Sequence, residues 1–245
     1  MPDASADTLA DIVRARHSAR VPFDPDREIP GADLQRILEC ARWAPTAHNM
    51  QNFVAIVLDD PALLAKIGAI RAAPSETFLA ENYWQLSFSE EELLRKGTGL
   101  LASQFPPAWR KPNAKPADAI EADELLANRS LQGCPTLLVM LYDGNRRAPA
   151  SEGDVLGIMS LGCVMQNIWL MAQALGVGLQ ILSVFNTGAP AKALRLLLEI
   201  PDHMKIGFCC RLGYPVESPG NYLRVRRSPG QFIHHNRYSP PTPGI

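Results

Sequence analysis

The feature that most constrains this fold is a long apolar segment in the second half of the chain. It runs from about Asp154 to Leu175 and is followed by Gly176, a residue type that commonly ends helices. Its apolar residues recur at helical spacing, and many positions between them are apolar as well. A helix that is apolar nearly all round is buried on most sides. The sequence therefore predicts a helix surrounded by a large core.

Helices and strands alternate along the rest of the chain. Continuous apolar runs of strand length predict strands at residues 53–58, 136–141, 177–184 and 206–212. Apolar residues at helical spacing predict further helices at residues 8–16, 30–45, 60–67 and 190–198. Asp7 is the expected N-cap of the first of these helices. This alternation indicates a mixed α/β or an α+β fold.

The charge balance excludes several classes of partner. Lysine and arginine number 24 against 25 aspartate and glutamate residues, which leaves a formal net charge of -1. A nucleic-acid coat or an electrostatic membrane binder needs a strong positive excess, so we expect no nucleic-acid and no membrane partner. No apolar run is expected to reach the roughly 18 to 20 residues that span a bilayer. Residues 1–11 are polar and acidic without an apolar signal core, so we expect a cytoplasmic protein.

The cysteines indicate a reducing compartment. Their number is odd, four of them lie within apolar segments, and no two form a C-x-x-C pair. The five are Cys40, Cys134, Cys163, Cys209 and Cys210. We therefore expect buried, reduced thiols rather than a disulfide framework or a zinc site.

Residues 73–129 are less regular than the rest of the chain. Ser89 and Glu92 have the spacing of a capping box that opens a short helix. A loop this long inside a compact domain is usually functional or mobile, so we expect an excursion, or lid, over the active site. Its aromatic residues are candidates for stacking on a substrate: Tyr83, Trp84, Phe88 and Trp109, together with Phe78. The alternative is that they form a small core of the lid itself.

The first polar cluster lies at residues 16–20, where the first predicted helix ends. Arg16 and Arg20 are four residues apart, so on a helical turn their side chains share a face and can converge on one anion. Ser18 adds a hydroxyl donor between them. Two guanidinium groups suit a phosphate because each forms strong charged hydrogen bonds. The alternative is a solvated basic helix end stabilised by the helix dipole.

Two further polar clusters follow. Residues 44–52, between a helix end and a strand, carry donors and acceptors that can read the edge of a planar heterocycle, although they can also form an ordinary hydrogen-bonded turn. In the tail, Arg224, Arg226 and Arg227 again indicate an anion site, although a run of charge is more often only solvated. The tail has no core of its own. It must therefore lie against its own domain or against a partner subunit.

Five short motifs follow one another over about 215 residues. They are R-x-S-x-R at residues 16–20, A-P-[ST]-x-x-N-x-Q at 44–51, Q-N leading into A-L-G-[LVI]-G at 166–178, L-x-I-P at 198–201, and G-Y-P with a basic R-x-P at 213–229. This order resembles that of the FMN-dependent nitroreductases. Two positions depart from the family's commonest pattern: Phe53 stands where many members have tryptophan, and Asn52 replaces a frequent proline.

The resemblance implies an α+β fold with a mixed central sheet flanked by helices, in a single domain of residues 1–245. It also implies a homodimer that binds FMN at its interface. Residues 73–129 would be the irregular lid. Residues 214–245 would be an extended C-terminal arm that embraces the dimer partner.

The resemblance assigns the FMN site by matching position. The phosphate and ribityl chain would be held by Arg16, His17, Ser18 and Arg20, with Arg227 and also Arg224 or Arg226 completing the phosphate site. The residues that would approach the flavin ring, from the other subunit, are Pro45, Thr46, Ala47 and Asn49. The loop at Leu182 and Ser183 would place a backbone N–H near flavin N5.

The implied reaction is a ping-pong hydride transfer. NADPH or NADH would reduce FMN at N5, and an electron-poor aromatic acceptor, above all a nitroaromatic compound, would then take the hydride. The flavin supplies this chemistry, so no catalytic side chain and no metal are expected. The sequence has no G-x-G-x-x-G motif, so a separate Rossmann domain is not indicated. The resemblance implies that the nicotinamide nucleotide shares the substrate cleft.

Other functions remain open. A reductive dehalogenase resembling iodotyrosine deiodinase would use a lid with Glu, Tyr and Lys, and Glu81, Tyr83 and Lys96 are present at a different spacing. An oxygen-dependent enzyme that cleaves flavin to make the lower ligand of cobalamin would also bind FMN, as would a flavin carrier without turnover. A metal hydrolase built on His234 and His235 is the remotest case, because adjacent histidines point in different directions.

Overall fold

Four strands form a central sheet in the order β1-β4-β6-β5, with all neighbours antiparallel. They are β1 (Phe53–Leu58), β4 (Thr136–Asp143), β5 (Gly178–Leu182) and β6 (Met204–Gly213). β1 matches its predicted strand residue for residue, and the ends of the others lie close to their predicted positions. Two short strands, β2 (Ser87–Phe88) and β3 (Leu100–Leu101), pair in parallel elsewhere in the chain. Together with the helices, these pairings confirm an α+β fold.

The chain divides into two units. One comprises Met1–Ala72 and Leu125–Gly220, and the other comprises Ala73–Glu124 and Asn221–Ile245. The computed structural model describes residues 2–72, 77, 80–104, 131, 133–149, 151, 153–186, 188–216 and 223–238. The central sheet belongs to the first unit, whereas β2 and β3 belong to the second.

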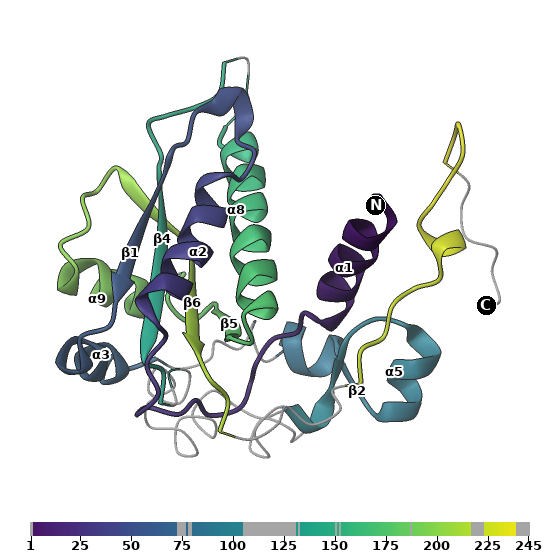
Figure 1. Ribbon diagram of the computed structural model, residues 1–245, viewed down its shortest axis with the longest axis horizontal. Helices are drawn as coiled ribbons and strands as arrows, with labels where there is room; N and C mark the ends of the chain where they lie inside the picture. The colour runs from purple at the N-terminus through teal and green to yellow at the C-terminus, as the bar shows by residue number, and fades with distance from the viewer. Residues whose placement is uncertain are drawn as a thin grey trace. The chain divides into compact units, whose positions relative to one another are not determined.

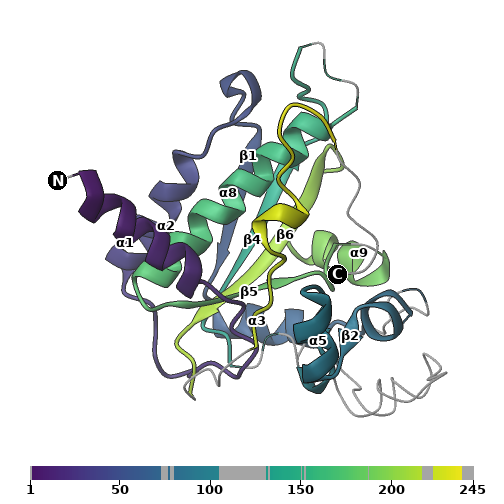
Figure 2. The same ribbon diagram turned by 90° about the vertical axis from the view of Figure 1, so that its right-hand side faces the viewer.

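Helices cover both faces of the central sheet (Figures 1 and 2). They are α2 (Gly31–Arg42) and α8 (Val155–Ala174) on one face, and α3 (Pro61–Gly68) and α9 (Gly188–Leu197) on the other. Because β4 is covered on both faces, its residues point alternately into the two cores. Leu138 and Met140 join the core beneath α2 and α8, whereas Leu137 and Val139 join the core beneath α3 and α9. The strand is therefore a continuous apolar run rather than an alternating one.

The first helix begins earlier than predicted. α1 spans Pro2–Ala15, so Asp7 lies inside the helix and the prediction that it is the N-cap is wrong. Proline suits the first helical turn because the amide hydrogen that it lacks has no partner there. α2 begins directly after Pro30 and ends ahead of Pro45, as predicted.

α8 is buried on one side only, so the prediction that core surrounds it is wrong. The buried side, toward the sheet, consists of Ser160, Leu161, Val164, Ile168 and Ala172. On the outer side, Val155, Ile158 and Met159 are 58%, 52% and 63% exposed. A single chain offers this helix one sheet face, so Val155, Ile158 and Met159 stay exposed within the described chain.

The length of α8 corrects a second expectation. Its 20 residues carry no charge, and a mean hydropathy of 1.6 makes the helix long and apolar enough to cross a bilayer. It is the one helix of this kind in the described chain. The core helix of a protein that never meets a membrane passes the same test of length and composition. Here the helix is fastened to α2, since the Asn167 side chain donates a hydrogen bond to the Cys40 carbonyl at 2.9 Å.

The second unit contains α5 (Glu90–Lys96), which the predicted capping box opens. The Glu92 amide donates to the Ser89 hydroxyl at 3.2 Å, and the Ser89 amide donates to the Glu92 carboxylate at 3.2 Å. Gly97 ends the helix in the left-handed conformation, with φ of 65°. A methyl group on Gly97 would lie 3.5 Å from the Arg226 carbonyl oxygen, so the C-terminal segment passes beside this helix end. The remaining short elements of this unit are η2 (Ala80–Gln85), η3 (Ala102–Gln104) and η5 (Pro229–Gln231).

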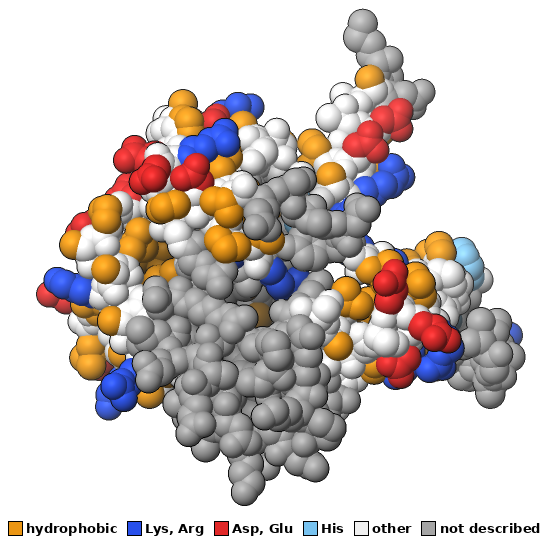
Figure 3. All heavy atoms as spheres, turned by 90° about the horizontal axis from the view of Figure 1, so that it is seen from below, with side chains coloured by type: hydrophobic (Ala, Val, Ile, Leu, Met, Phe, Trp, Pro, Cys, Tyr) orange, Lys and Arg blue, Asp and Glu red, His pale blue; other side chains and the backbone are white. Residues whose placement is uncertain are grey.

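Charges of both signs are distributed over the surface. In the described part of the face shown in Figure 3, acidic, basic and apolar side chains are interspersed without an extended field of one sign. This distribution agrees with a net charge of -1. It gives no sign of the basic stripe that a general nucleic-acid binder presents.

Candidate functional site

The segment at residues 16–20 is irregular rather than helical. α1 ends at Ala15, so Arg16 and Arg20 do not share a helical turn and that part of the prediction is wrong. Arg16 instead lies over the ring of Trp169 in α8, with 4.4 Å between its guanidinium carbon and the ring centroid. The same indole donates to the His17 carbonyl at 3.1 Å. Arg16, His17 and Ser18 are half-buried and Arg20 is exposed, so the segment presents its cations from a fixed backbone.

The turn at residues 44–52 is strained. It contains η1 (Ala47–Asn49), and three of its residues have a positive φ: His48 at 51°, Asn49 at 53° and Gln51 at 45°. Each left-handed residue that is not glycine costs roughly 1 kcal/mol or more, and such strain is concentrated at functional sites. Part of this cost is offset locally, because the Gln51 amide donates to the Thr46 hydroxyl at 3.1 Å. The turn holds a defined shape that an unconstrained loop would not adopt.

α8 anchors this turn through a side chain that the sequence did not single out. The Ser160 hydroxyl accepts a hydrogen bond from the Ala47 amide at 3.1 Å and donates one to the Leu156 carbonyl at 2.7 Å. Ser160 is 5% exposed. A lone serine within an apolar helix carries no sequence signal for this role. Pro45 and Asn49 are exposed, and Thr46 and Ala47 are half-buried, so all four predicted residues lie at the surface of an anchored turn.

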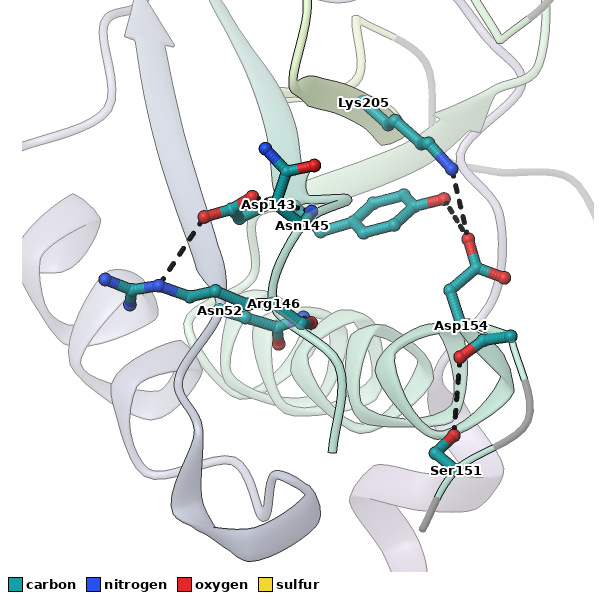
Figure 4. A network of polar contacts seen from close by, with 9 residues as sticks. Asn52, Asp143, Asn145, Arg146, Ser151, Asp154 and Lys205 are labelled. Atoms are coloured by element: carbon teal, nitrogen blue, oxygen red, sulfur yellow. Dashed lines mark hydrogen bonds and ion pairs between the residues drawn. The ribbon is translucent and has the colours of Figure 1, made fainter. Parts of the chain in front are cut away.

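Asn52 also fixes the turn, from its other end. Asn52 is 6% exposed. Its side-chain amide donates to the Arg146 backbone carbonyl at 3.4 Å, and its backbone carbonyl accepts from the Asp143 backbone amide at 2.9 Å. A proline here would lack this side-chain hydrogen bond. The departure from the family's commonest pattern thus ties the turn to the loop after β4, which Figure 4 shows beside α8.

A polar network secures the start of α8 (Figure 4). The Tyr142 hydroxyl donates to Asp154 at 2.9 Å, and Lys205 lies 3.4 Å from the same carboxylate oxygen. Burial, and then the hydrogen bond to the Asp154 carboxylate, raise the pKa of Tyr142 to about 12. The hydrogen bond from Tyr142, followed by the effect of Lys205, lowers the pKa of Asp154. The carboxylate therefore stays ionised, and the network ties β4 and β6 to the first turn of α8.

Of the two residues predicted where β5 ends, Leu182 can offer only its backbone and Ser183 offers its backbone and a hydroxyl. Leu182 is 3% exposed and its side chain belongs to the core beneath α3 and α9. Ser183 is exposed, and its carbonyl accepts from the Asn186 amide at 3.1 Å. The role of the loop at Leu182 and Ser183 through a backbone N–H stays a prediction.

The arm begins on the first unit. The Val216 amide donates to the Pro22 carbonyl at 3.1 Å, and the Asp24 amide donates to the Tyr214 carbonyl at 2.8 Å. Further on, in the second unit, Arg224 and Arg227 are exposed. The guanidinium of Arg227 lies 5.9 Å from the ring centroid of Phe232, a neighbour in the same arm. The contact described for Arg227 is thus local to the arm.

Of the predicted lid aromatics, Phe88 is the one whose side chain the structure describes. Its ring is half-buried, with Lys96 at 3.6 Å from the centroid. A methyl group on Gly99 would lie 2.5 Å from the ring, so glycine is needed for this packing. The arrangement supports the alternative that Phe88 belongs to a small core of the second unit. The side chains of Tyr83 and Trp84, and the whole of Phe78 and Trp109, lie outside the described residues.

Comparison with known proteins settles the family. The profile of the nitroreductase family matches residues 13–214, which include the 16–20 segment, the 44–52 turn and the whole central sheet. The chain belongs to the nitroreductase family. A relative from Archaeoglobus fulgidus, provisionally named NADH dehydrogenase/NAD(P)H nitroreductase, is 26% identical over 227 residues, covering 93% of this chain and 97% of its own length.

Solved structures share the nitroreductase fold. A protein from Clostridium acetobutylicum, provisionally named NADH oxidase, superposes with a TM-score of 0.60 at 18% identity, over 93% of this chain and 99% of that one. A nitroreductase from Bacteroides fragilis with bound FMN gives a TM-score of 0.55 at 18% identity, over 92% and 97% of the two chains. At such identities the likeness concerns the fold.

The donor set of this nitroreductase suits FMN. Two guanidinium groups, an imidazole and a hydroxyl within residues 16–20 match the charge and hydrogen-bonding capacity of a phosphate and a ribityl chain. The rigid 44–52 turn carries amide and hydroxyl groups suited to a ring edge. Both sets lie within the first unit, and each is fastened to α8.

The remaining reactive groups are inert or scattered. All five cysteines are free, and burial raises the pKa of Cys134 to about 11 and that of Cys209 to about 12. Buried thiols with raised pKa values are poor nucleophiles. Among the described residues there is no cluster of three or more histidine, cysteine or acidic side chains that could hold a metal ion.

Proposed function

We propose that this nitroreductase is an FMN-dependent oxidoreductase that uses NAD(P)H to reduce an electron-poor aromatic acceptor, above all a nitroaromatic compound. The observation that carries the proposal is the donor set at residues 16–20, held against α8 in a chain whose family includes an FMN-bound structure. An anion site built on a fixed backbone binds without first ordering its cations.

The residues take the following roles in this proposal. The FMN phosphate and ribityl chain are bound by Arg16, His17, Ser18 and Arg20, with Arg227 and Arg224 from the arm. The edge and face of the flavin ring meet Pro45, Thr46, Ala47 and Asn49. The loop at Leu182 and Ser183 supplies a backbone N–H toward the ring. Tyr83, Trp84 and Trp109 remain candidates for contact with the acceptor, whereas the packing of Phe88 favours a structural role.

When bound, FMN supplies the redox chemistry, accepting a hydride from NADPH or NADH and passing it to the acceptor in a ping-pong cycle. The chain itself binds, orients and shields, and it needs no catalytic acid, nucleophile or metal for these steps. The 44–52 turn contributes a rigid wall, because its strained backbone is fixed at both ends by Ser160 and Asn52. The 16–20 segment contributes positive charge next to the phosphate.

A homodimer is part of the same proposal. The outer side of α8 exposes Val155, Ile158 and Met159, and α1 exposes Leu9 and Val13 at 55% and 43%. Apolar surface in this amount on two helices that contact each other is typical of a subunit interface. We expect a cytoplasmic dimer in which the arm of each chain reaches its partner, and its mass is measured by light scattering on the flavin-loaded protein.

The test of the proposed function is spectroscopic. The purified protein is expected to be yellow, to bleach under anaerobic NADPH or NADH, and to recover its colour when a nitroaromatic compound is added. Yellow protein that neither nucleotide bleaches would favour a flavin carrier or an oxygen-dependent enzyme. Colourless protein that takes up no added FMN would contradict the cofactor assignment itself.

A further inference from the structure

A buried arginine lies where strand β6 leaves the sheet. Arg211 is 1% exposed and is the largest side chain among the fully buried residues. It stands between Cys210 and Leu212, both of which face the core beneath α2 and α8, so its own side chain leaves from the opposite face of the strand. A cation buried this deeply destabilises the fold unless hydrogen bonds satisfy it.

Two of the four hydrogen bonds described for Arg211 reach one segment. Its Nη2 donates to the carbonyl oxygens of Ala19 and Val21, at 2.9 Å and 2.7 Å. Its Nη1 donates to the Leu131 carbonyl at 3.1 Å, and its Nε donates to the side-chain oxygen of Gln180 at 2.9 Å. Ala19 and Val21 are the residues immediately before and after Arg20. One guanidinium group thus fixes the carbonyl on each side of the exposed arginine.

Other contacts fix the same stretch of chain. The Ala19 amide donates to the Leu179 carbonyl of β5 at 2.9 Å. The guanidinium of Arg211 also lies over the ring of Phe23, at 4.3 Å from its centroid, and that ring is 1% exposed. With Ala19 buried and its carbonyl held inward, Arg20 is directed outward.

We propose that Arg211 is a positioning residue for phosphate recognition: it contacts no ligand itself, but it sets the direction in which Arg20 presents its guanidinium. The inference rests on the proposed phosphate site. A planar fork with five N–H donors can hold two carbonyls on one side and two further acceptors on the other, whereas a lysine ammonium offers no such fixed geometry. Arg211→Lys therefore keeps the charge and removes the orientation.

The experiment compares FMN with riboflavin, which lacks the phosphate, by titrating the full-length protein after its flavin has been removed. For Arg211→Lys we expect the Kd for FMN to rise about tenfold or more, the equivalent of one charge-assisted hydrogen bond. The Kd for riboflavin stays within about twofold, because no phosphate contact is lost.

Arg195→Lys is the matched control. The guanidinium of Arg195 also donates to three backbone carbonyls of the first unit, those of Ile200, Pro201 and Met204, but to none in the 16–21 segment. It should lower thermal stability and leave the preference for FMN over riboflavin unchanged. If Arg211→Lys weakens both flavins in proportion, or neither, then Arg211 is only structural and the inference is overturned.

Arg20→Ala tests the proposed phosphate site separately from the positioning role of Arg211. If it keeps the full preference for FMN, the proposed phosphate site is wrong and the inference falls with it. If Arg20→Ala loses the preference while Arg211→Lys keeps it, the site stands and the positioning role alone is overturned.

Should Arg211→Lys not fold, Gln180→Ala replaces it. This variant removes one acceptor of the Arg211 guanidinium and is expected to shift the preference for FMN over riboflavin in the same direction by a smaller factor. An unchanged preference in Gln180→Ala would then overturn the inference.

Discussion

The two arginine clusters of this nitroreductase differ in what holds them. The cluster at residues 16–20 is bound to its own unit through the Trp169 indole, the Arg211 guanidinium and the β5 backbone. The cluster at residues 224–227 is exposed, and the contacts described for Arg226 and Arg227 are with Val225 and Phe232 of the same arm.

The arginines of the two clusters therefore lose different amounts of conformational entropy when they bind FMN. A cation on a fixed backbone loses little conformational freedom when it meets a phosphate, whereas a cation on an exposed arm must also be ordered. We infer that the first cluster supplies most of the affinity for FMN and that the second adds to it once the arm is docked.

The largest effect is expected from Arg20→Ala. Loss of a guanidinium that contacts the phosphate through its fork should raise the Kd for FMN about 100-fold, the equivalent of two charge-assisted hydrogen bonds. Flavin content after gel filtration and a fluorescence titration measure it. Arg14→Ala is the control, since Arg14 lies in α1 and pairs with Asp11 at 3.3 Å in an exposed position. Full flavin retention in the Arg20 variant would exclude residues 16–20 as the phosphate site.

A smaller effect is expected from Arg227→Ala. Part of the energy of its phosphate contact is offset by the ordering of the arm, so the Kd for FMN should rise only about tenfold. Arg237→Ala, in the same exposed arm, serves as the control. An effect larger than that of Arg20→Ala would invert the comparison and make the arm the principal phosphate site.

Ser160→Ala tests whether anchoring matters in the 44–52 turn as it does in the 16–20 segment. The variant leaves the Ala47 amide without its acceptor, which costs about 1 kcal/mol of stability. We expect the Kd for FMN to rise by a small factor and the visible bands of the bound flavin to shift, because the turn forms the proposed wall of the ring site. Ser151→Ala is the control, as its hydroxyl bonds only locally to the Gly153 carbonyl at 3.4 Å. Unchanged bands would argue against this turn as a ring contact.

Tyr142→Phe is expected to leave the Kd for FMN unchanged. The variant should lower the unfolding temperature by about 2–4 °C, the equivalent of one hydrogen bond in a chain of this size. Its pH dependence follows from two opposite shifts. The lowered pKa of Asp154 means that the stabilisation is present above the ordinary aspartate pKa and is lost as the pH falls through the folded value.

At the alkaline end the sign reverses. The pKa of Tyr142 is raised to about 12, so its stabilisation is complete below the ordinary tyrosine pKa of about 10 and is lost as the pH rises through the folded value. The difference in unfolding temperature between Tyr142→Phe and the wild type should thus be constant between the ordinary pKa values of aspartate and tyrosine. It should shrink at lower and at higher pH. Calorimetry across this range measures it, and a difference independent of pH would exclude the Tyr142–Asp154 hydrogen bond as its cause.

The sequence predicted what depends on local patterns. The apolar run at residues 53–58 and the capping box at Ser89 and Glu92 matched the structure because strand length and cap chemistry are determined within a few neighbouring residues. The start of α1 was missed, since Asp7 can cap a helix but can equally lie inside one.

What the sequence did not predict depends on distant contacts. Ser160, Asn52 and Arg211 each fasten a site segment through a partner that is far away along the chain, and no local pattern marks them. The left-handed residues of the 44–52 turn are similar, because tertiary anchoring rather than residue preference imposes their conformation. The burial of α8 was overestimated because uniform apolarity does not tell a helix buried on all sides from one that packs on a single sheet face.

The one-sided burial of α8 has a consequence for a freshly synthesised chain. Until its outer side is covered, the helix combines a sheet-facing half with an exposed half whose length and composition resemble those of a membrane span. Chaperones and membrane-insertion machinery recognise that kind of surface, so in the proposed dimer the pairing of subunits competes with misdirection at low protein concentration. Variants isolated for poor solubility should therefore fall on the sheet-facing side of α8, where a change releases the whole helix, more often than on its outer side.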